Sequence, residues 1–457
     1  MEQTLIAKTF MGLEPVLAQE LNALGAKDVQ EGRRMVSFSG DKEMMYRANF
    51  SLHTAIRILK PIKTFKVTSA DEVYEEIKKI DWGTYLIQDR QSSSLGSFAV
   101  DAVVYGDEFR HSKYVAYKVK DAICDQFREK LGKRPNISVD NPDLRIHIHI
   151  AEDEATLCLD SSGESLHKRG YRQAQVEAPL NEVLAAGMIM LTGWKGDCDF
   201  IDPMCGSGTI LIEAALIAQN MSPGLFRKEY AFEKWPDFDR DLFEKIYNDD
   251  SQEREFNHKI YGYDIDMTAV QKAIANVKSA GLTEHISVEQ KDFKDFEYNG
   301  RQQNSKHCVL VTNPPYGERI STQNLLNTYK MIGERFKHQF MGCDAWVLSY
   351  REDCFGQIGL RPSIKFPLYN GSLECMFNKY QIFDGKLKKF RQEGGSIKTD
   401  EERHQMAKRK FKSRKKPDFT TMENVGDEIG KIRLQQSHDR WKQKQFIKRQ
   451  LEEDDEI

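Results

Sequence analysis

The stretch from residue 199 to residue 219 places the strongest constraint on the fold. Asp199 to Asp202 has the composition of a short buried strand, and Thr209 to Gln219 has that of a helix. Between them stands a loop of small residues, Asp202-Pro203-Met204-Cys205-Gly206-Ser207-Gly208-Thr209. Strand, glycine loop and helix in this order indicate a doubly wound α/β fold. The alternation continues with strands expected at 259–264, 286–290, 308–312, 345–349 and 374–383 and helices at 267–280 and 325–340.

The glycine loop is expected to bind a small ligand other than a phosphate. Glycines allow a ligand to approach the backbone closely. Leu211 stands where a dinucleotide fingerprint needs its third glycine, and the lysine of a phosphate-binding P-loop is missing. The start of the helix suits a carboxylate, and the Asp202 side chain suits an ammonium group. Both groups occur at the methionine end of S-adenosylmethionine. The alternative is a purely structural turn.

Acidic residues follow the next two expected strands. Asp264 can accept hydrogen bonds from both hydroxyls of a ribose, as carboxylates at this position do in dinucleotide-binding folds. Asp266 precedes an apolar-periodic run and is expected mainly to cap the helix that starts at Met267. Asp292 and Phe293 would suit an adenine, the first binding its amino group and the second stacking on its ring. An ordinary turn is the simpler interpretation of this last pair taken alone.

The strand at 308–312 leads into the sequence Asn313-Pro314-Pro315-Tyr316, at the edge where open α/β sheets bind ligands. Pro314 has no N–H, so its carbonyl and the Asn313 side-chain oxygen can form a rigid pair of acceptors. Two acceptors suit an exocyclic amine, and holding both N–H bonds favours a nitrogen whose lone pair points at a methyl sulfonium. Tyr316 is expected to stack on the base. These four are the predicted catalytic residues, and the alternative is an ordinary proline turn.

Composition excludes several classes of protein. No uninterrupted apolar run approaches the roughly 18 residues needed to cross a bilayer. The first 30 residues carry acidic side chains among short apolar stretches, unlike a secretion signal. The 8 cysteines are scattered, without a Cys-x-x-Cys pair or a histidine at zinc-ligand spacing. We therefore expect a cytoplasmic protein with reduced thiols, no metal site and no membrane contact.

The residues before about 160 have the pattern of an α+β region without a glycine-rich nucleotide loop, which favours binding over catalysis. Farther along, the segment from Asn220 to His258 interrupts the α/β alternation and is interpreted as an insertion near the ligand site. In the N-terminal region, helices are expected at 14–24, 72–80 and 113–131 and strands at 5–9, 35–38, 98–104, 145–150 and 155–159.

The C-terminal end differs in charge from the rest of the chain. Residues 386–457 hold 20 Lys and Arg against 14 Asp and Glu, a net charge of +6, whereas residues 1–385 carry −9. Eight of these basic residues and no acidic residue lie in the stretch from Arg403 to Lys416. This tail favours contact with a polyanion, for which Lys408, Arg409 and Lys410 are candidates. A solvated, partly disordered end would have the same composition.

These motifs resemble those of the amino methyltransferases with an Asn-Pro-Pro-Tyr motif. DPMCGSGT, NPPYGER and HKRGYR occur with FMGLE, YKVKDAI and RPN nearer the N-terminus. Over residues 1 to about 385 the chain is similar to the bacterial 23S rRNA guanine-N2 methyltransferases that carry a THUMP domain. The resemblance implies a Rossmann-like methyltransferase domain preceded by an α+β ferredoxin-like and THUMP RNA-binding region. The basic tail lies outside it.

The resemblance also implies domain boundaries and residue roles. The chain would divide into a ferredoxin-like unit at 1–60, a THUMP domain at 61–162, a methyltransferase domain at 163–385 and the tail at 386–457. Pro179 and Asn181 would close over the cofactor. The implied contacts with structured RNA come from basic residues of the THUMP domain and the HKRGYR motif, namely Lys113, Lys118, Lys120, Arg134, Lys168, Arg169 and Arg172.

Taken with the resemblance, the residues predict S-adenosylmethionine-dependent methylation of the exocyclic N2 amine of a guanine. The substrate would be 23S rRNA or its assembly precursor, with the base flipped into the Asn313 site. A second methyltransferase domain, which is fused to some relatives, is not expected because no second glycine loop follows. The alternatives are a tRNA guanine-N2 methyltransferase, a DNA amino methyltransferase, a glutamine methyltransferase and a non-catalytic RNA-binding ribosome-assembly factor.

Overall fold

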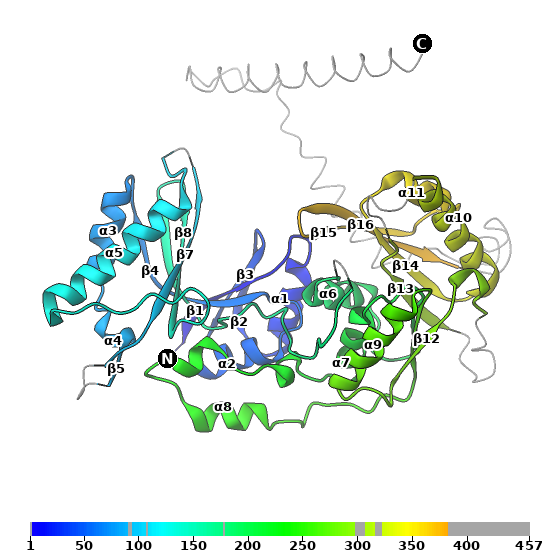
Figure 1. Ribbon diagram of the computed structural model, residues 1–457, viewed down its shortest axis with the longest axis horizontal. Coiled ribbons are helices and arrows are strands. Elements are labelled where there is room, and N and C mark those ends of the chain that lie inside the picture. Colours follow the sequence, from blue (N-terminus) through cyan, green and yellow to red (C-terminus); the bar gives the residue numbers. More distant parts are fainter. Residues whose placement is uncertain are drawn as a thin grey trace, which may run out of the picture. The chain divides into compact units, whose positions relative to one another are not determined.

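The alternating strands and helices after residue 179 form a seven-stranded sheet in the computed structural model (Figure 1). The structure describes residues 2–89, 94–106, 108–176, 179–297, 307–315 and 322–382. A second seven-stranded sheet is formed by residues nearer the N-terminus, together with a small two-stranded sheet. The expected Rossmann-like domain and α+β region are both present.

The C-terminal sheet has the strand order β12-β11-β10-β13-β14-β16-β15. Its first five strands run parallel, and β16 pairs antiparallel with both β14 and β15. β10 and β13 are buried along their whole length, as in parallel sheets covered on both faces. The strands are β10 (Asp199–Asp202), β11 (Ile260–Asp264), β12 (Ile286–Gln290), β13 (Cys308–Thr312), β14 (Asp344–Ser349), β15 (Ile364–Asn370) and β16 (Leu373–Gln381).

The helices of this half connect successive strands. One of them, α6, is apolar on nearly all sides, is buried along most of its length and packs against α7. The order β12-β11-β10-β13 means that the chain winds outward in one direction from β10 and then returns to its other side, so a topological switch point lies between β10 and β13. The helices are α6 (Glu182–Thr192), α7 (Thr209–Gln219), α9 (Met267–Ser279), α10 (Thr322–Gln339) and α11 (Glu352–Gln357), with a 3-10 turn η3 (Phe293–Asp295).

The N-terminal sheet has the strand order β2-β3-β1-β4-β9-β8-β7. Its neighbouring strands are antiparallel, except that β7 and β8 run parallel. In β8, fully buried side chains alternate with half-buried ones, as expected when one face packs on a core. The strands are β1 (Gln3–Lys8), β2 (Lys27–Gly32), β3 (Met35–Gly40), β4 (Arg57–Lys66), β7 (Phe98–Tyr105), β8 (Leu144–Ala151) and β9 (Glu154–Asp160).

Strand β4 joins the two parts of the N-terminal sheet. It pairs with β1 at its start and with β9 along most of its length. A register shift between Pro61 and Lys63 marks a bulge, which accommodates a proline that has no N–H for the ladder. The predicted boundary between residues 60 and 61 therefore falls inside one continuous strand.

Helices of the N-terminal half cover one side of this sheet. Helix α5 packs against both α3 and β7 (Figure 1). It ends at Gly132, whose left-handed backbone stops the helix. The helices are α1 (Glu14–Ala23), α2 (Lys42–Ser51), α3 (Ala70–Lys78), α4 (Gly83–Leu86) and α5 (Ser112–Leu131), and the two-stranded sheet consists of β5 (Ile87–Asp89) and β6 (Ser94–Leu95).

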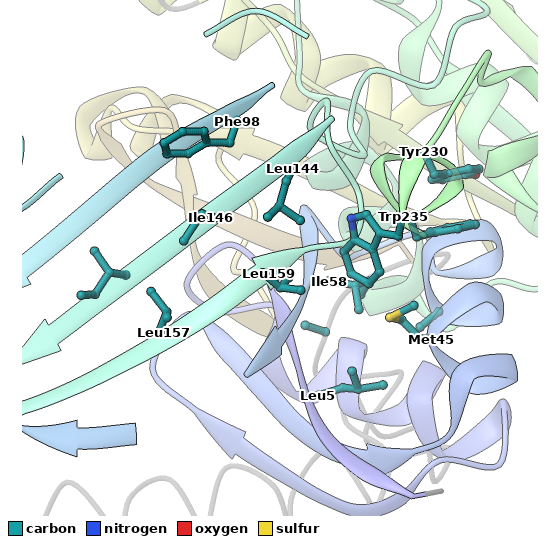
Figure 2. Close-up of a cluster of buried hydrophobic side chains, with 14 of the residues drawn as sticks. Leu5, Met45, Ile58, Phe98, Leu144, Ile146, Leu157, Leu159, Tyr230 and Trp235 are labelled. Atoms are coloured by element: carbon teal, nitrogen blue, oxygen red, sulfur yellow. The ribbon is translucent and has the colours of Figure 1, made fainter. Parts of the chain in front are cut away.

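The segment 220–258, interpreted as an insertion near the ligand site, packs mainly on the N-terminal core. Its Phe232 ring stacks on Tyr46 of α2 with 4.3 Å between centroids. Figure 2 shows Tyr230 and Trp235 in the same cluster as Met45 and Ile58. Apolar burial against α2 therefore decides where the segment lies. It contains η1 (Pro223–Phe226), η2 (Ala231–Lys234) and α8 (Arg240–Tyr247).

Candidate functional site

Three predicted site segments leave the same edge of the C-terminal sheet. β10 lies between β11 and β13, and all three strands are parallel. Asp202 is in register with Gly262, and Ile201 with Leu310. Because parallel strands end at a common edge, Asp202, Asp264 and the residues after Thr312 lie at adjoining strand ends beside the switch point.

Glycine is needed at the two positions of the loop for different structural reasons. Gly206 and Gly208 both have positive φ angles, 54° and 82°. A Cβ on Gly208 would lie 3.2 Å from the Cβ of Ala273 in α9, whereas at Gly206 the nearest atom would be 3.7 Å away on Val176. Gly208 is thus required for packing of α9, while Gly206 leaves backbone open to a ligand. Valine at position 208 would damage the packing as well as the site.

Asp202 is a buried carboxylate without a cation. Its side chain is only 1% exposed, and no ion pair to it is found in the described parts of the chain. Its Oδ1 accepts a hydrogen bond from the Met204 N–H at 3.2 Å. Burial raises the pKa of Asp202 to about 7, and the neighbouring Asp264 carboxyl adds to the increase. An unpaired buried charge is unfavourable, so a ligand ammonium at this point would be stabilising.

Asp264 is held in a fixed orientation. One of its oxygens accepts the Gly206 N–H and the other the Asp266 N–H, both at 2.9 Å. Each carboxylate oxygen still has capacity for one more donor, such as a ribose hydroxyl. Asp266 accepts the Thr268 N–H at 2.9 Å, which confirms it as the cap of α9.

Ile265, between these two acids, was missed by the sequence analysis. Its side chain is 66% exposed. An apolar side chain beside the Asp264 carboxylate offers a surface for the flat ring of a nucleoside. The available signal was its place directly after Asp264 in the chain.

The interpretation of Phe293 as an adenine-stacking residue is wrong. Its side chain is 3% exposed and packs in the core against Phe340 and Phe336, with ring centroids 5.9 and 6.4 Å away. Asp292 stays near the surface, where it caps η3 by accepting the Lys294 N–H at 3.0 Å. Burial raises the pKa of Asp292, but the bonds from Lys294 outweigh this and leave it below its usual value. Adenine binding by Asp292 stays a prediction.

Asn313 presents an acceptor at the end of β13. Its side-chain Oδ1 is buried and has no donor among the residues that the structure describes. Pro314 is buried and Pro315 is exposed, so the chain turns outward here. Tyr316 lies outside the described residues. A buried carbonyl oxygen without a donor is costly, which makes this oxygen a candidate ligand contact.

Arg172, implied as an RNA contact, is half-buried and makes its hydrogen bonds within the fold. Its guanidinium donates to Ser207 Oγ at 3.1 Å, to Thr209 Oγ1 at 3.0 Å and to Glu182 Oε1 at 2.9 Å. It therefore ties the glycine loop to the start of α6. Asn181 caps the same helix by accepting the Val183 N–H at 2.9 Å, beside the half-buried Pro179.

Arg169, also implied as an RNA contact, is only 2% exposed and is likewise bonded within the fold. Its Nε lies 3.3 Å from Oε1 of Glu213 in α7, and Tyr171 donates to that oxygen at 3.0 Å. The guanidinium also donates to the His53 carbonyl. Burial lowers the pKa of Arg169, but Glu213 more than compensates and leaves it raised. Arg169 thus connects the N-terminal half to α7.

The remaining predicted RNA contacts lie on the surface where the structure describes them. Lys118 and Lys120 on α5 place Nζ 5.6 and 5.3 Å from the ring centroids of Tyr114 and Tyr117, two exposed tyrosines. Such cation and aromatic pairs suit a nucleic acid surface. Lys408, Arg409 and Lys410 lie outside the described residues. Lys113, Arg134 and Lys168 are exposed.

Neither a metal cluster nor a membrane-spanning helix is found in the described parts of the chain. They contain no cluster of three or more His, Cys, Asp or Glu placed to hold a metal ion. None of their helices has the length and apolar character to span a bilayer. All eight cysteines are buried.

The chain is similar to known protein families over three parts of its length. Family models match at residues 4–59 (RlmL ferredoxin-like domain), 67–160 (THUMP domain) and 169–379 (RMKL-like, methyltransferase domain). The chain is 38% identical over 386 residues to ribosomal RNA large subunit methyltransferase K/L of Syntrophotalea carbinolica. That match covers 82% of this chain but 53% of the relative, so the chain spans about half of that protein's length.

Two further matches cover nearly the whole of the other protein. The Synechocystis protein slr0064, provisionally named an RNA methyltransferase, is 36% identical over 81% of this chain and 95% of its own. The crystal structure of SMU.472, provisionally described as a methyltransferase and complexed with SAH, has a TM-score of 0.74 at 30% identity. It covers 84% of this chain and 99% of its own.

Proposed function

The chain belongs to the family of RNA methyltransferases that combine a THUMP domain with an RMKL-like methyltransferase domain, and from this premise we propose that it methylates the exocyclic N2 amine of a guanine in 23S rRNA. The observation that carries the proposal is the buried Asn313 oxygen, an acceptor without a donor, at the strand end adjoining that of Asp202. The cofactor is S-adenosylmethionine, which when bound supplies a methyl group carried on a sulfonium.

The residues at the sheet edge fit this cofactor. Asp202 would pair with the ammonium group, since its buried carboxylate has no cation of its own. The N-terminus of α7 would bind the carboxylate. Asp264 would accept the ribose hydroxyls, and the exposed Ile265 would pack on the adenine. Arg172 keeps the loop in place for these contacts.

Asn313 and Pro314 would hold the guanine amine. The Asn313 Oδ1 and the Pro314 carbonyl accept its two N–H bonds, so that the nitrogen lone pair is aimed at the methyl group. The base must leave its stack to reach this point, and Tyr316 would stack on it there. No residue with a shifted pKa is needed as a base before attack, because the methylated nitrogen becomes acidic and releases its proton afterwards.

The rest of the chain would deliver the RNA. We assign residues 1–60 to a ferredoxin-like unit, 61–162 to a THUMP domain that grips structured RNA and 163–385 to the methyltransferase. The basic residues 386–457 would add contacts to phosphates without reading sequence. The partner is 23S rRNA or its assembly precursor, and the reaction takes place in the cytoplasm.

A labelled-methyl transfer assay tests the substrate. Purified protein is offered naked large-subunit rRNA, tRNA, DNA and ribosomal protein in parallel, and labelled nucleosides are identified by mass spectrometry. We expect label in N2-methylguanine of the rRNA. Label in tRNA, in DNA or in a glutamine side chain would replace this proposal by the corresponding alternative, and no transfer to any of them would favour a binding protein.

The substitution Asn313→Ala tests the mechanism. Losing one preorganised polar partner costs about 10² to 10³ in rate, so single-turnover methylation should fall by that factor. Affinity for S-adenosylmethionine should not change, because Asn313 contacts the amine. Asn327→Ala, at an exposed position of α10, is the matched control. A near-normal rate in Asn313→Ala would contradict the amine-holding role.

A further inference from the structure

A large cleft lies apart from the carboxyl edge of the C-terminal sheet. Its volume is about 1090 Å³. The glycine loop, Asp264 and Asn313, which we assign to cofactor or guanine, do not line it. It borders the proposed cofactor site through Arg172 and Pro179–Glu182. Its walls come mainly from residues 139–145, 162–170, 179–182 and 226–234, four segments that are separate in sequence.

Basic residues outnumber acidic residues on the walls of this cleft. Eight Lys and Arg and four Asp and Glu line it, but Arg57, Arg145 and Arg169 pair with carboxylates outside the lining. Among the described residues, the two lining cations without a salt bridge are Arg227 and Lys228. Concave surfaces lined by one sign of charge focus the field and attract counter-charged ligands. The cleft therefore selects for an anion.

Arg227 on its wall forms no salt bridge with a carboxylate of the described residues. Its guanidinium donates to the carbonyls of Lys168, Ser165 and Glu164 at 2.9, 3.1 and 2.8 Å. Its Nε is buried without an acceptor. Burial lowers the pKa of Arg227 and outweighs the opposing influence of Tyr230 and Glu164. An anion in the cleft would offset this cost.

The size and lining of the cleft suit a polymer. Pockets that enclose one small ligand have volumes of about 300 to 1,000 Å³, and this cleft exceeds that range. Lys228 is exposed at the wall beside Arg227, and no carboxylate of the described residues pairs with it. His167 supplies an uncharged polar group, since burial lowers its pKa to about 4. Cations with a neutral ring between them fit a nucleic acid strand.

We propose that this cleft binds the phosphate backbone of the RNA strand that flanks the target guanine. The inference rests on the proposed function for the identity of the RNA. It also gives the insertion 220–258 a role, because residues 226–234 form one wall. The insertion would thus serve RNA binding from a position on the N-terminal core.

Lys228→Glu is the first test, with Lys245→Glu as its control. Both lysines are exposed in the same insertion, but only Lys228 lines the cleft. Affinity for large-subunit rRNA fragments, measured by fluorescence anisotropy, should fall about threefold to tenfold in Lys228→Glu. The slope of log affinity against log salt should become shallower by about 0.7 to 0.9 for one lost phosphate contact. Calorimetric affinity for S-adenosylmethionine should not change in either variant.

Glu229→Gln is the second test, because damage to the fold cannot mimic its sign. Removing this rim carboxylate, which lies 3.6 Å from Lys234, should strengthen RNA binding. Glu244→Gln is the control, since Glu244 is similarly exposed and lies 4.0 Å from Arg240 on α8, outside the cleft. Unchanged affinity and salt slope in both cleft variants would overturn the inference and leave the cleft to an acidic protein partner.

These binding measurements do not depend on turnover. If wild-type protein transfers methyl groups but the cleft variants bind RNA like their controls, the inference fails and the proposed function stands. If the cleft variants change RNA affinity as expected but the wild type methylates nothing, the proposed function fails and the cleft remains an RNA site.

Discussion

Asp202 and Glu213 are two buried carboxylates near the start of α7, and their surroundings differ sharply. Asp202 is 1% exposed and Glu213 is fully buried. Asp202 accepts one backbone N–H and has no cation, so its pKa rises to about 7. Burial also raises the pKa of Glu213, but Arg169 outweighs this and leaves it below its usual value.

The difference separates a structural charge from a functional one. Glu213 is neutralised within the protein by Arg169 and hydrogen-bonded by Tyr171, so it needs no ligand. Asp202 lacks these partners, and a strongly perturbed group of this kind in a loop at a sheet edge is a candidate for ligand binding. Helix α7 is therefore tied to the N-terminal half through Glu213, whereas the loop before its first residue is open to the cofactor.

Removing the Arg169 side chain should produce the largest effect, a loss of unfolding free energy. Arg169→Met leaves the Glu213 carboxylate buried and unpaired, which costs about 3 to 5 kcal/mol of unfolding free energy. Urea unfolding monitored by circular dichroism measures this. Arg240→Met is the control, because Arg240 is mostly exposed and its contact with Glu244 is long, so little should change. A loss below 1 kcal/mol in Arg169→Met would mean that the pair does not hold the structure together.

Replacing Asp202 should weaken cofactor binding without lowering the free energy of unfolding. Asp202→Asn keeps an oxygen for the Met204 N–H but removes the charge. A charge-assisted hydrogen bond contributes about 1.5 to 3 kcal/mol, so S-adenosylmethionine affinity should fall roughly tenfold to a hundredfold by calorimetry. Asp241→Asn, exposed on α8, is the control. Undiminished affinity would remove Asp202 from the cofactor site.

The open end of α7 was predictable because its signals are local. Glycines at 206 and 208, an acid at a strand end and a cap at Asp266 are each read from a few consecutive residues. The strands at 199–202, 286–290 and 308–312 and the helix at 209–219 have the predicted bounds. Helix α6 was missed because a helix that is apolar on nearly all sides has no amphipathic period.

The contacts that hold Glu213 and the glycine loop were not predictable, because their partners are distant in sequence. Arg169 and Arg172 belong to a basic run that suggests RNA, and their use inside the fold depends on Glu213 and the glycine loop. Phe293 is buried by Phe340, from a different part of the chain. Strand β4 was missed because Pro61 and its lysines obscure the alternation, and only pairing with β1 and β9 makes it a central strand.

The two carboxylates should also give opposite dependences of stability on pH. For Asp202 the folded pKa of about 7 lies above the ordinary aspartate value of 3.8. Folding therefore becomes less favourable as pH rises from about 4 to 7, and Asp202→Asn should stabilise the protein more at pH 8 than at pH 4. For Glu213 the folded pKa lies below 4.5, so its contribution is present above that pH and is lost in acid. Glu213→Gln should then cost less at pH 4 than at pH 8, measured by urea unfolding.

The affinity for the cofactor should also depend on pH, and this is the smallest of the expected effects. The ligand ammonium pairs with the ionised Asp202, so affinity should increase as pH rises through about 7. For a group with this pKa, the ionised fraction and hence the affinity should change about tenfold between pH 6 and pH 8. The dependence should disappear in Asp202→Asn, which cannot ionise, and persist in Glu213→Gln, because that charge is neutralised far below this range. An equal pH dependence in wild type and Asp202→Asn would place the titrating group elsewhere. The contrast between Asp202 and Glu213 would then concern stability alone.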